Sequence, residues 1–461
     1  MSIFQGEEVL IMKDNDRFIL DIKRLGINGE GIGFYNRMAI FVPNAIPGEG
    51  HDIEITSVKG NMAFGKSLEI KNISKDRKVP ECPYYGNCGG CNTMHISYEK
   101  MLEEKRNLLI EAINRYTKIN PKKFEIFQTI GSPNQFNYRN RSQLQVRKYE
   151  DGLHVCMLKE NSNITVPIND CLVQKNIIND INEKIIEIME KMGFDAYNHK
   201  NKNGNIRYIT IRANKKNEAL VCLVCYKKDD NIKNLAIEIN KIPEVKGVYE
   251  SINSNIKENT ILGETINHLV GEEYIIEEIG KIKYQIYPNT FFQLNSEQAE
   301  ELFNRVLKVC KLSRKETVLD AYCGVGAIGL FLAKMSKEVI GIENNKDSIE
   351  CANKNAQLNK INNASFYHGD ASILLPKMLN EGKQFDVIVV DPPRTGLSDK
   401  FMKALLESNV KRIVYVSCNP STLAKNLEVL SSKYNINSIT PLDLFPQTSN
   451  VECVCQLVLK N

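Results

Sequence analysis

Short apolar runs separated by glycine, proline and polar residues fill the first part of the chain. They predict five strands at regular spacing, at residues 18–22, 29–33, 39–43, 51–55 and 63–66. Five short strands with turn signals between them are typical of a small closed barrel of the OB type. Such a barrel commonly binds RNA, although a barrel used only for packing remains an alternative.

Helical periodicity follows in two segments. Residues 97–118 place Met101, Leu109 and Ile113 on one stripe after a candidate N-cap at Ser97, so we expect a long amphipathic helix. A second helix is expected at residues 177–192. It lies within a region from about residue 125 to 285 that otherwise has the pattern of a mixed, strand-rich domain.

Strand and helix patterns alternate after Pro288. The predicted strands are residues 317–320, 338–343, 364–367, 385–390 and 412–416, with helical patterns between them. This alternation predicts an α/β fold with a doubly wound parallel sheet. Ligands of such sheets bind at the carboxyl ends of the strands, so chemistry is expected there.

One predicted strand carries polar side chains with a period of two. Arg139, Arg141, Gln143, Gln145 and Arg147 fall on one face, and residues 131–149 include no acidic residue. A solvated sheet face has this pattern, and so does a surface that contacts phosphates. Both interpretations stay open.

The composition is that of a folded protein, with 42% hydrophobic and 25% charged residues among 461. A net charge of +4 does not by itself indicate a nucleic-acid binder. No apolar run approaches the ~18 residues of a membrane-spanning helix, and residues 1–8 lack the pattern of a signal peptide. We therefore expect no membrane contact and a cytoplasmic location.

The 13 cysteines are an odd number, and with no export signal a disulfide framework is not expected. The thiols are therefore expected to be reduced, metal-bound or catalytic, and Cys82, Cys88 and Cys91 fall within ten residues. Cys222 and Cys225 lie in an apolar strand pattern that directs their thiols to opposite faces, so we interpret them as core residues.

A glycine-rich turn from Asp320 to Gly329 follows the first strand of the α/β part and contains the G-x-G-x-x-G pattern. Glu343 ends the next strand, where a carboxylate can accept hydrogen bonds from ribose hydroxyls. NAD and S-adenosylmethionine both use this geometry. An acid at Asp320 favours S-adenosylmethionine, whose amino-acid tail is cationic, because a pyrophosphate would be repelled.

The next strand ends in Asp391-Pro392-Pro393-Arg394, in which two prolines fix a turn that projects Asp391 towards a cofactor or a base edge. A purely structural turn is the alternative. Cys418 closes the fifth strand in Ser-Cys-Asn-Pro and is a candidate nucleophile, the alternative being a buried apolar cysteine. Methylation at C5 of a pyrimidine needs such a thiolate, because C5 becomes nucleophilic only after a thiolate adds to C6.

That reaction also needs a base that removes the proton from C5. Glu452, which lies just before the final predicted strand, is a candidate, although an ordinary surface glutamate is the alternative.

Together, the cysteine cluster, Phe291-Phe292-Gln293, the glycine-rich turn, Asp-Pro-Pro-Arg, Ser-Cys-Asn-Pro and the terminal Val-Glu resemble the S-adenosylmethionine-dependent RNA (uracil-5-)-methyltransferases. The resemblance covers nearly the whole chain and includes a TRAM domain. It implies a TRAM barrel at residues 1–72 and a β-rich, cluster-binding central domain at 73–95 and 125–285. A Rossmann-like class I methyltransferase domain would span residues 96–124 and 286–461.

The same resemblance implies the roles of the candidate residues. S-adenosylmethionine would be bound by Gln293, Tyr322, Glu343 and Asp391, with Cys418 as the nucleophile and Glu452 as the base. A four-iron, four-sulfur (4Fe-4S) cluster would be held by Cys82, Cys88, Cys91 and Cys171. Zinc bound by the same four cysteines is the alternative, because ligand type alone does not choose between the two.

The resemblance also bears on the substrate. Relatives that act on transfer RNA frequently lack both the TRAM domain and the cysteine cluster, so the resemblance implies one or more uridines of 23S ribosomal RNA as the substrate. Separately, we expect the protein to be a monomer. A uridine of transfer RNA is the alternative substrate. A non-catalytic RNA-binding factor is the alternative class of function.

Overall fold

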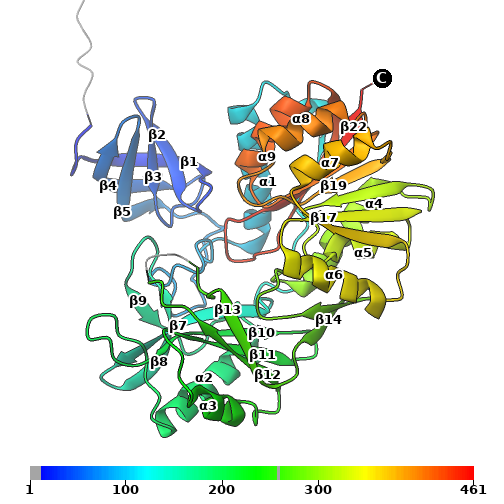
Figure 1. Ribbon diagram of the computed structural model, residues 1–461. Coiled ribbons are helices and arrows are strands. Elements are labelled where there is room, and N and C mark those ends of the chain that lie inside the picture. The colour runs from blue at the N-terminus through cyan, green and yellow to red at the C-terminus, as the bar shows by residue number, and fades with distance from the viewer. Residues whose placement is uncertain (1–11, 257–259, 461) are drawn as a thin grey trace, which may run out of the picture.

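The computed structural model describes residues 12–256 and 260–460. Residues 1–8, for which the sequence predicts no signal peptide, lie outside the described residues. Figure 1 shows three bodies: a small barrel at the start of the chain, a strand-rich central body, and a larger C-terminal body whose sheet is covered by helices. No helix of the described chain is long and apolar enough to cross a membrane.

The barrel confirms the five predicted strands. It is closed, and its strands in pairing order are β1 (Arg17–Leu25), β2 (Gly31–Tyr35), β3 (Met38–Val42), β5 (Met62–Asn72) and β4 (Gly50–Lys59). Alternate residues such as Leu20, Ile22 and Ile53 fill its interior. Glycine is required at Gly31, because a Cβ atom there would stand 2.7 Å from the Cβ and the carbonyl oxygen of Ala45.

The central body is a seven-stranded sheet with helices α2 (Asn176–Lys191) and α3 (Ile232–Ile239) on one face. In pairing order its strands are β13 (Thr265–Gly271), β12 (Val245–Ile252), β11 (Ala219–Cys225), β10 (Ile206–Ala213), β7 (Arg141–Tyr149), β8 (Gly152–Leu158) and β9 (Thr165–Pro167). Cys222 and Cys225 of β11 are buried in two different hydrophobic clusters, which confirms that they are core residues on opposite faces.

Strand β7 has the predicted alternation. Leu144 and Val146 pack under the two helices, whereas Gln143 and Gln145 are half-buried on the other face. Arg139 differs from the prediction because it precedes the strand and pairs with Gln174 in an isolated bridge.

The C-terminal body contains an eight-stranded sheet. Its order is β18 (Ala364–His368), β17 (Glu338–Glu343), β16 (Thr317–Ala321), β19 (Val387–Val390), β20 (Arg412–Ser417), β22 (Glu452–Leu459), β21 (Tyr434–Leu442) and β6 (Glu125–Ile126). The five predicted strands, β16 to β20, are parallel, as expected. The sheet as a whole is mixed, because β22 runs antiparallel to β20.

Helices cover both faces of this sheet, as the α/β prediction required. One face packs against α4 (Ser296–Cys310), α5 (Ala327–Ala333), α6 (Lys346–Leu358) and the hairpin β14 (Ile275–Ile279) and β15 (Ile282–Ile286). The other packs against α1 (Tyr98–Tyr116), α7 (Ala371–Asn380), α8 (Asp399–Glu407) and α9 (Pro420–Leu430). Neighbouring residues of β16 alternate between the faces, with Val318 in the first cluster and Leu319 in the second.

Helix α1 fastens the start of the C-terminal body to the end of the chain. It confirms the helix predicted at residues 97–118, but the hydroxyl of Ser97 donates to Asp76 instead of capping the helix. After the single turn η1 (Pro121–Lys123), the chain enters β6. Lys105 of α1 is fully buried, and its Nζ lies 2.5 Å from Oδ1 of Asp443, which is also fully buried. This ion pair fixes the segment that follows β21.

Candidate active site

Five of the predicted site residues lie at one edge of the eight-stranded sheet. Tyr322, Asp391 and Cys418 directly follow β16, β19 and β20, and Glu343 is the last residue of β17. Glu452 begins β22, which is antiparallel to β20, so its start lies at the same edge where β20 ends. The fold therefore assembles residues that are separated by up to 130 positions in the sequence.

The glycine turn after β16 has the open backbone that a close-fitting ligand needs. Tyr322, Gly324 and Gly326 have φ angles of 67°, 53° and 78°, in the left-handed region. A Cβ atom on Gly324 would meet nothing within 4 Å, so this side of the turn faces open space. Its N–H donates to Oε2 of Glu343 (3.2 Å), and Oε1 of Glu343 accepts from the N–H of Asn345 (2.9 Å).

Asp320 is buried near the end of β16. Its side chain is fully buried, and its Oδ2 accepts a hydrogen bond from the N–H of Gly329 in α5 (2.7 Å). Burial raises the pKa of Asp320 to about 8, with smaller contributions from Asp391 and Glu343. Through Oδ2, this carboxyl group connects the first turn of α5 to β16.

Gln293 and Tyr322, the other two predicted cofactor residues on loops, have different contacts. Gln293 is half-buried between β15 and α4, and its carbonyl oxygen accepts from Nδ2 of Asn140 (2.9 Å), which ties it to the central body. The ring of Tyr322 meets the edge of the Phe401 ring at 5.5 Å between centroids. Burial raises the pKa of Tyr322 to about 12, so its hydroxyl keeps its proton and stays available as a donor.

The strand register brings Cys418 and Glu452 together. In the antiparallel ladder of β20 and β22, Ser417 pairs with Cys453. The ladder ends at this pair, and Cys418 and Glu452 are the next residues of the two chain segments. The thiol and the carboxyl group are close enough that the charge of Glu452 acts on the Cys418 thiol.

Burial and neighbouring negative charges raise the pKa values of the side chains at this edge. Burial raises the pKa of the Cys418 thiol to about 11, and the charges of Glu452 and Asp391 add to the shift. Burial, with Asp391, raises the pKa of Glu452 well above its usual range, and burial raises that of Asp391 to about 7. Arg394 opposes the shifts of Cys418 and Glu452 because its positive charge favours their ionised forms.

A separate cavity of about 270 Å³ is lined by the four predicted metal-ligating cysteines, Cys82, Cys88, Cys91 and Cys171. All four are half-buried and free. Burial raises the pKa values of Cys88, Cys91 and Cys171, and the other thiols of the group contribute to each shift. Within residues 12–256 and 260–460, no three His, Cys, Asp or Glu side chains are arranged to hold a metal ion.

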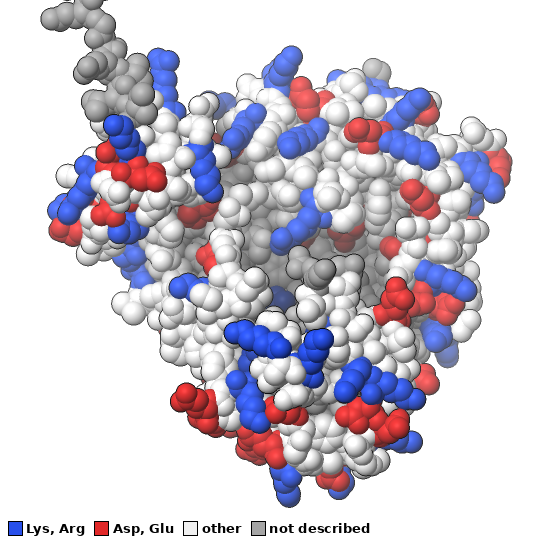
Figure 2. Space-filling view, turned by 60° about the vertical axis from the view of Figure 1, so that its left-hand side comes forward, with Lys and Arg blue, Asp and Glu red and all other residues white. Residues whose placement is uncertain are grey.

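Sequence patterns did not reveal which residues support the site. Arg394 belongs to the Asp-Pro-Pro-Arg motif, but no role was predicted for it from the sequence. In the structure its positive charge acts to lower the pKa values of Cys418 and Glu452, and its guanidinium group donates to Oδ1 of Asn450 (3.2 Å). The two prolines that precede it were the local signal. Figure 2 shows a recess in the middle of one face of the molecule, with Lys and Arg side chains in and around it.

The site combines a glycine turn, a strand-end glutamate and a strand-end cysteine on a doubly wound sheet. This combination is typical of a methyltransferase that binds a nucleoside-containing cofactor. A family model described as tRNA (Uracil-5-)-methyltransferase matches residues 97–460, and a TRAM domain model matches residues 17–68. The chain belongs to this family. It is an RNA (uracil-C5-)-methyltransferase that uses S-adenosylmethionine.

Its relatives match along the whole chain. An uncharacterized RNA methyltransferase of Halalkalibacterium halodurans is 40% identical over 452 residues, which cover 97% of each chain. One of Listeria monocytogenes is 39% identical over 454 residues, which cover 98% of this chain and 99% of that one. Among solved structures, the Pyrococcus abyssi tRNA (uracil-54, C5)-methyltransferase in complex with S-adenosyl-L-homocysteine matches with a TM-score of 0.74 and 30% identity, over 96% of this chain and all of that one.

Proposed function

We propose that the protein transfers a methyl group from S-adenosylmethionine to C5 of a uridine in 23S ribosomal RNA, through a covalent bond between Cys418 and C6. The observation that carries this proposal is the proximity of Cys418 and Glu452, which adjoin the last pair of the β20–β22 ladder, at the sheet edge where Glu343 and the glycine turn lie. A nucleophile and a base on neighbouring strands, beside a nucleoside site, match the two demands of C5 methylation.

The steps assign one task to each residue. The Cys418 thiolate adds to C6 and moves the C5=C6 electrons into an enolate at C4. C5 then attacks the methyl carbon, whose bond to sulfur breaks and leaves S-adenosylhomocysteine. Glu452 accepts the proton from C5, the double bond re-forms and the Cys418–C6 bond breaks. The target base must leave its stack to reach this edge, as in other enzymes that act on a base.

The cofactor would lie along the same edge. Glu343 has one lone pair occupied on each oxygen and accepts readily from ribose hydroxyls, while the open side of Gly324 leaves room for the nucleoside. Gln293 and Tyr322 supply further polar groups. Asp391 stands between this cofactor region and Cys418, where it is in reach of both the cofactor and the target base.

The choice of 23S ribosomal RNA rests on the joint presence of the barrel and the four-cysteine cavity. A uridine of transfer RNA is the second candidate, because the Pyrococcus abyssi protein named as a tRNA (uracil-54, C5)-methyltransferase matches 96% of this chain. The chemistry at Cys418 is the same for both.

Label transfer separates the two substrates. We expect the protein, incubated with methyl-labelled S-adenosylmethionine, to place the label in 5-methyluridine of unmodified 23S ribosomal RNA and not in transfer RNA. Digestion to nucleosides and chromatography identify the product. Label found only in transfer RNA would move the substrate and keep the chemistry, and label in neither RNA would contradict the proposed function.

We further propose that Cys82, Cys88, Cys91 and Cys171 hold a 4Fe-4S cluster. A cubane spreads its four thiolate ligands around a body of several atoms, which suits four thiols around a cavity of about 270 Å³. Because burial and the neighbouring thiols raise the pKa values of Cys88, Cys91 and Cys171, loading must release protons and becomes tighter as the pH rises.

Metal analysis tests this centre. Protein purified without oxygen should be brown and contain about four irons per chain. Cys171→Ser should lose most of the iron, whereas the matched variant Cys156→Ser, which removes a buried thiol of β8 outside this cavity, should keep it. A colourless protein with one zinc would contradict the proposed cluster.

A further inference from the structure

The segment between β21 and β22 comprises residues 443–451 and directly precedes Glu452. It makes hydrogen bonds or ion pairs with all three bodies of the molecule. At its start, Lys105 of α1 pairs with Asp443. In its middle, the hydroxyl of Tyr138 donates to the carbonyl oxygen of Pro446 (2.9 Å). Near its end, Arg394 donates to Asn450. A loop held at this many points is a candidate for positioning the residue that follows it.

Asn92 makes the densest set of these contacts. Its backbone N–H donates to the carbonyl oxygen of Gln447 (3.1 Å), and so does the N–H of Thr93 (3.2 Å). Its side-chain Oδ1 accepts from the N–H of Ser449 (2.9 Å), and its Nδ2 donates to Oγ of Ser449 (3.2 Å) and to the carbonyl oxygen of Asn28. One amide side chain thus joins the barrel to the segment that precedes Glu452.

Ser449 completes the connection. Only 3% of its surface is exposed, and its Oγ donates to the carbonyl oxygen of Ile27 in the barrel (2.7 Å). Asn92 directly follows Cys91, one of the thiols of the four-cysteine cavity. The barrel turn, the cysteine segment and the loop before Glu452 therefore meet at two side chains, Asn92 and Ser449.

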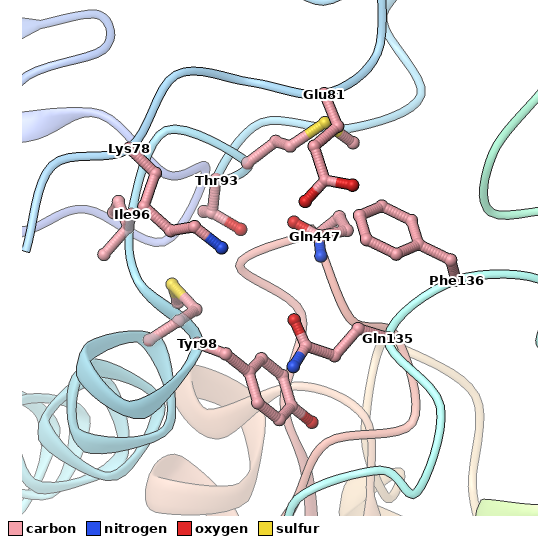
Figure 3. Close-up of a pocket in the computed structure, with 10 residues that line it drawn as sticks. Lys78, Glu81, Thr93, Ile96, Tyr98, Gln135, Phe136 and Gln447 are labelled. Carbon is pink, nitrogen blue, oxygen red and sulfur yellow. The ribbon is translucent and has the colours of Figure 1, made fainter.

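The backbone at this meeting point is held in an unusual conformation. Gln447 has a φ of 68°, in the left-handed region that non-glycine residues rarely adopt, and its carbonyl oxygen is the one that the Asn92 and Thr93 amides bind. Figure 3 shows Gln447 at the centre of this junction, with Thr93 on one side and Gln135 and Phe136 on the other. Such a conformation persists only where the surroundings enforce it.

We propose that Asn92 is a positioning residue for methyl transfer, because it fixes residues 446–450 against the barrel and so holds Glu452 near Cys418. This inference rests on the proposed function, in which Glu452 removes the C5 proton. Glu452 lies three residues after Ser449 and pairs with Leu442 at the end of the β21–β22 ladder, whereas the β20–β22 ladder begins only at Cys453, so Glu452 has no ladder pair on that side. The loop contacts made by Asn92 replace that missing support.

The test is Asn92→Ala, assayed with methyl-labelled S-adenosylmethionine and 23S ribosomal RNA. A displaced base slows removal of the proton but not addition of Cys418 or methyl transfer. We therefore expect kcat to fall between about tenfold and a hundredfold, KM for S-adenosylmethionine to stay unchanged, and a denaturant-stable protein–RNA adduct to accumulate. Hydrogen exchange should also become faster at the amide of Ser449, a readout that does not depend on turnover.

Asn72→Ala is the matched control. The Asn72 side chain also bonds two backbone groups, the N–H of Gly50 and the carbonyl oxygen of Gly48, but both lie within the barrel. This variant should lose barrel stability without accumulating the adduct. Ser449→Ala should have an effect in the same direction, because it removes the bond between Asn92 Nδ2 and Ser449 Oγ and the bond from Ser449 Oγ to the carbonyl oxygen of Ile27. Because the two variants share the first of these bonds, the effect of the double variant should be smaller than the sum of the two single effects.

The outcomes are distinguishable. A wild-type protein that methylates no uridine contradicts the proposed function itself. An active wild-type protein whose Asn92→Ala variant shows an increased KM for RNA without adduct, or unchanged kinetics, overturns only the positioning role of Asn92.

Discussion

Replacing Cys418 with alanine should reduce methyl transfer by at least about 10³-fold while S-adenosylmethionine binding changes little. Without a thiolate at C6, the C5 atom of uracil has no electrons to offer the methyl group, and no other residue at the sheet edge replaces that chemistry. Labelled methyl transfer to 23S ribosomal RNA measures the first quantity, and calorimetry with the cofactor measures the second.

The control for this variant is Cys310→Ala, which removes a buried thiol at the end of α4, away from the site edge. It should keep nearly full activity.

The pH dependence gives a second check on Cys418. Because burial and two carboxyl groups raise the pKa of its thiol to about 11, the thiolate fraction increases with pH, and kcat/KM should increase from neutral to alkaline pH. Full turnover by Cys418→Ala would remove it as the nucleophile.

Glu452→Gln should have the second large effect, a loss of turnover of about 10²-fold or more together with a trapped covalent complex. Glutamine cannot accept the C5 proton, so the reaction stops after methyl transfer. The substitution also removes a negative charge that raises the pKa of Cys418, which makes formation of the thiolate easier. The complex should appear as a shifted protein band that survives denaturant and disappears after treatment with ribonuclease.

Glu250→Gln is the matched control, because Glu250 of β12 is also buried and burial likewise raises its pKa, but it lies in the central sheet. It should give neither the loss of turnover nor the shifted band. Normal turnover by Glu452→Gln would instead exclude Glu452 as the base.

The sequence predicted those features that depend on local periodicity. The barrel strands, α1, α2 and the five parallel strands have patterns of period 2 or 3.6, which one face or stripe of buried residues imposes. The sequence also predicted that Tyr322 and Glu343 would lie together, since parallel neighbouring strands place their carboxyl ends at one edge. A motif at the end of a strand therefore carries positional information that a motif elsewhere does not.

Local periodicity could not predict contacts between segments that are far apart in the sequence. Lys105 and Asp443 are 338 positions apart and Asn92 and Ser449 are 357 apart, and no periodicity relates the members of either pair. Asp320 shows another limit. Its position before the glycine turn suggested a ligand, and the hydrogen bond that its Oδ2 accepts from the amide of Gly329 could not be predicted from the sequence. Competition between a ligand and the backbone for one polar group is visible only in three dimensions.

Mass spectrometry of the complex trapped by Glu452→Gln tests the central claim most directly. After digestion of both protein and RNA, the account predicts one peptide that contains Cys418 and carries a uridine nucleotide with one additional methyl group. The same peptide without a nucleotide, or a nucleotide attached to another residue, would contradict the proposed covalent bond between Cys418 and C6.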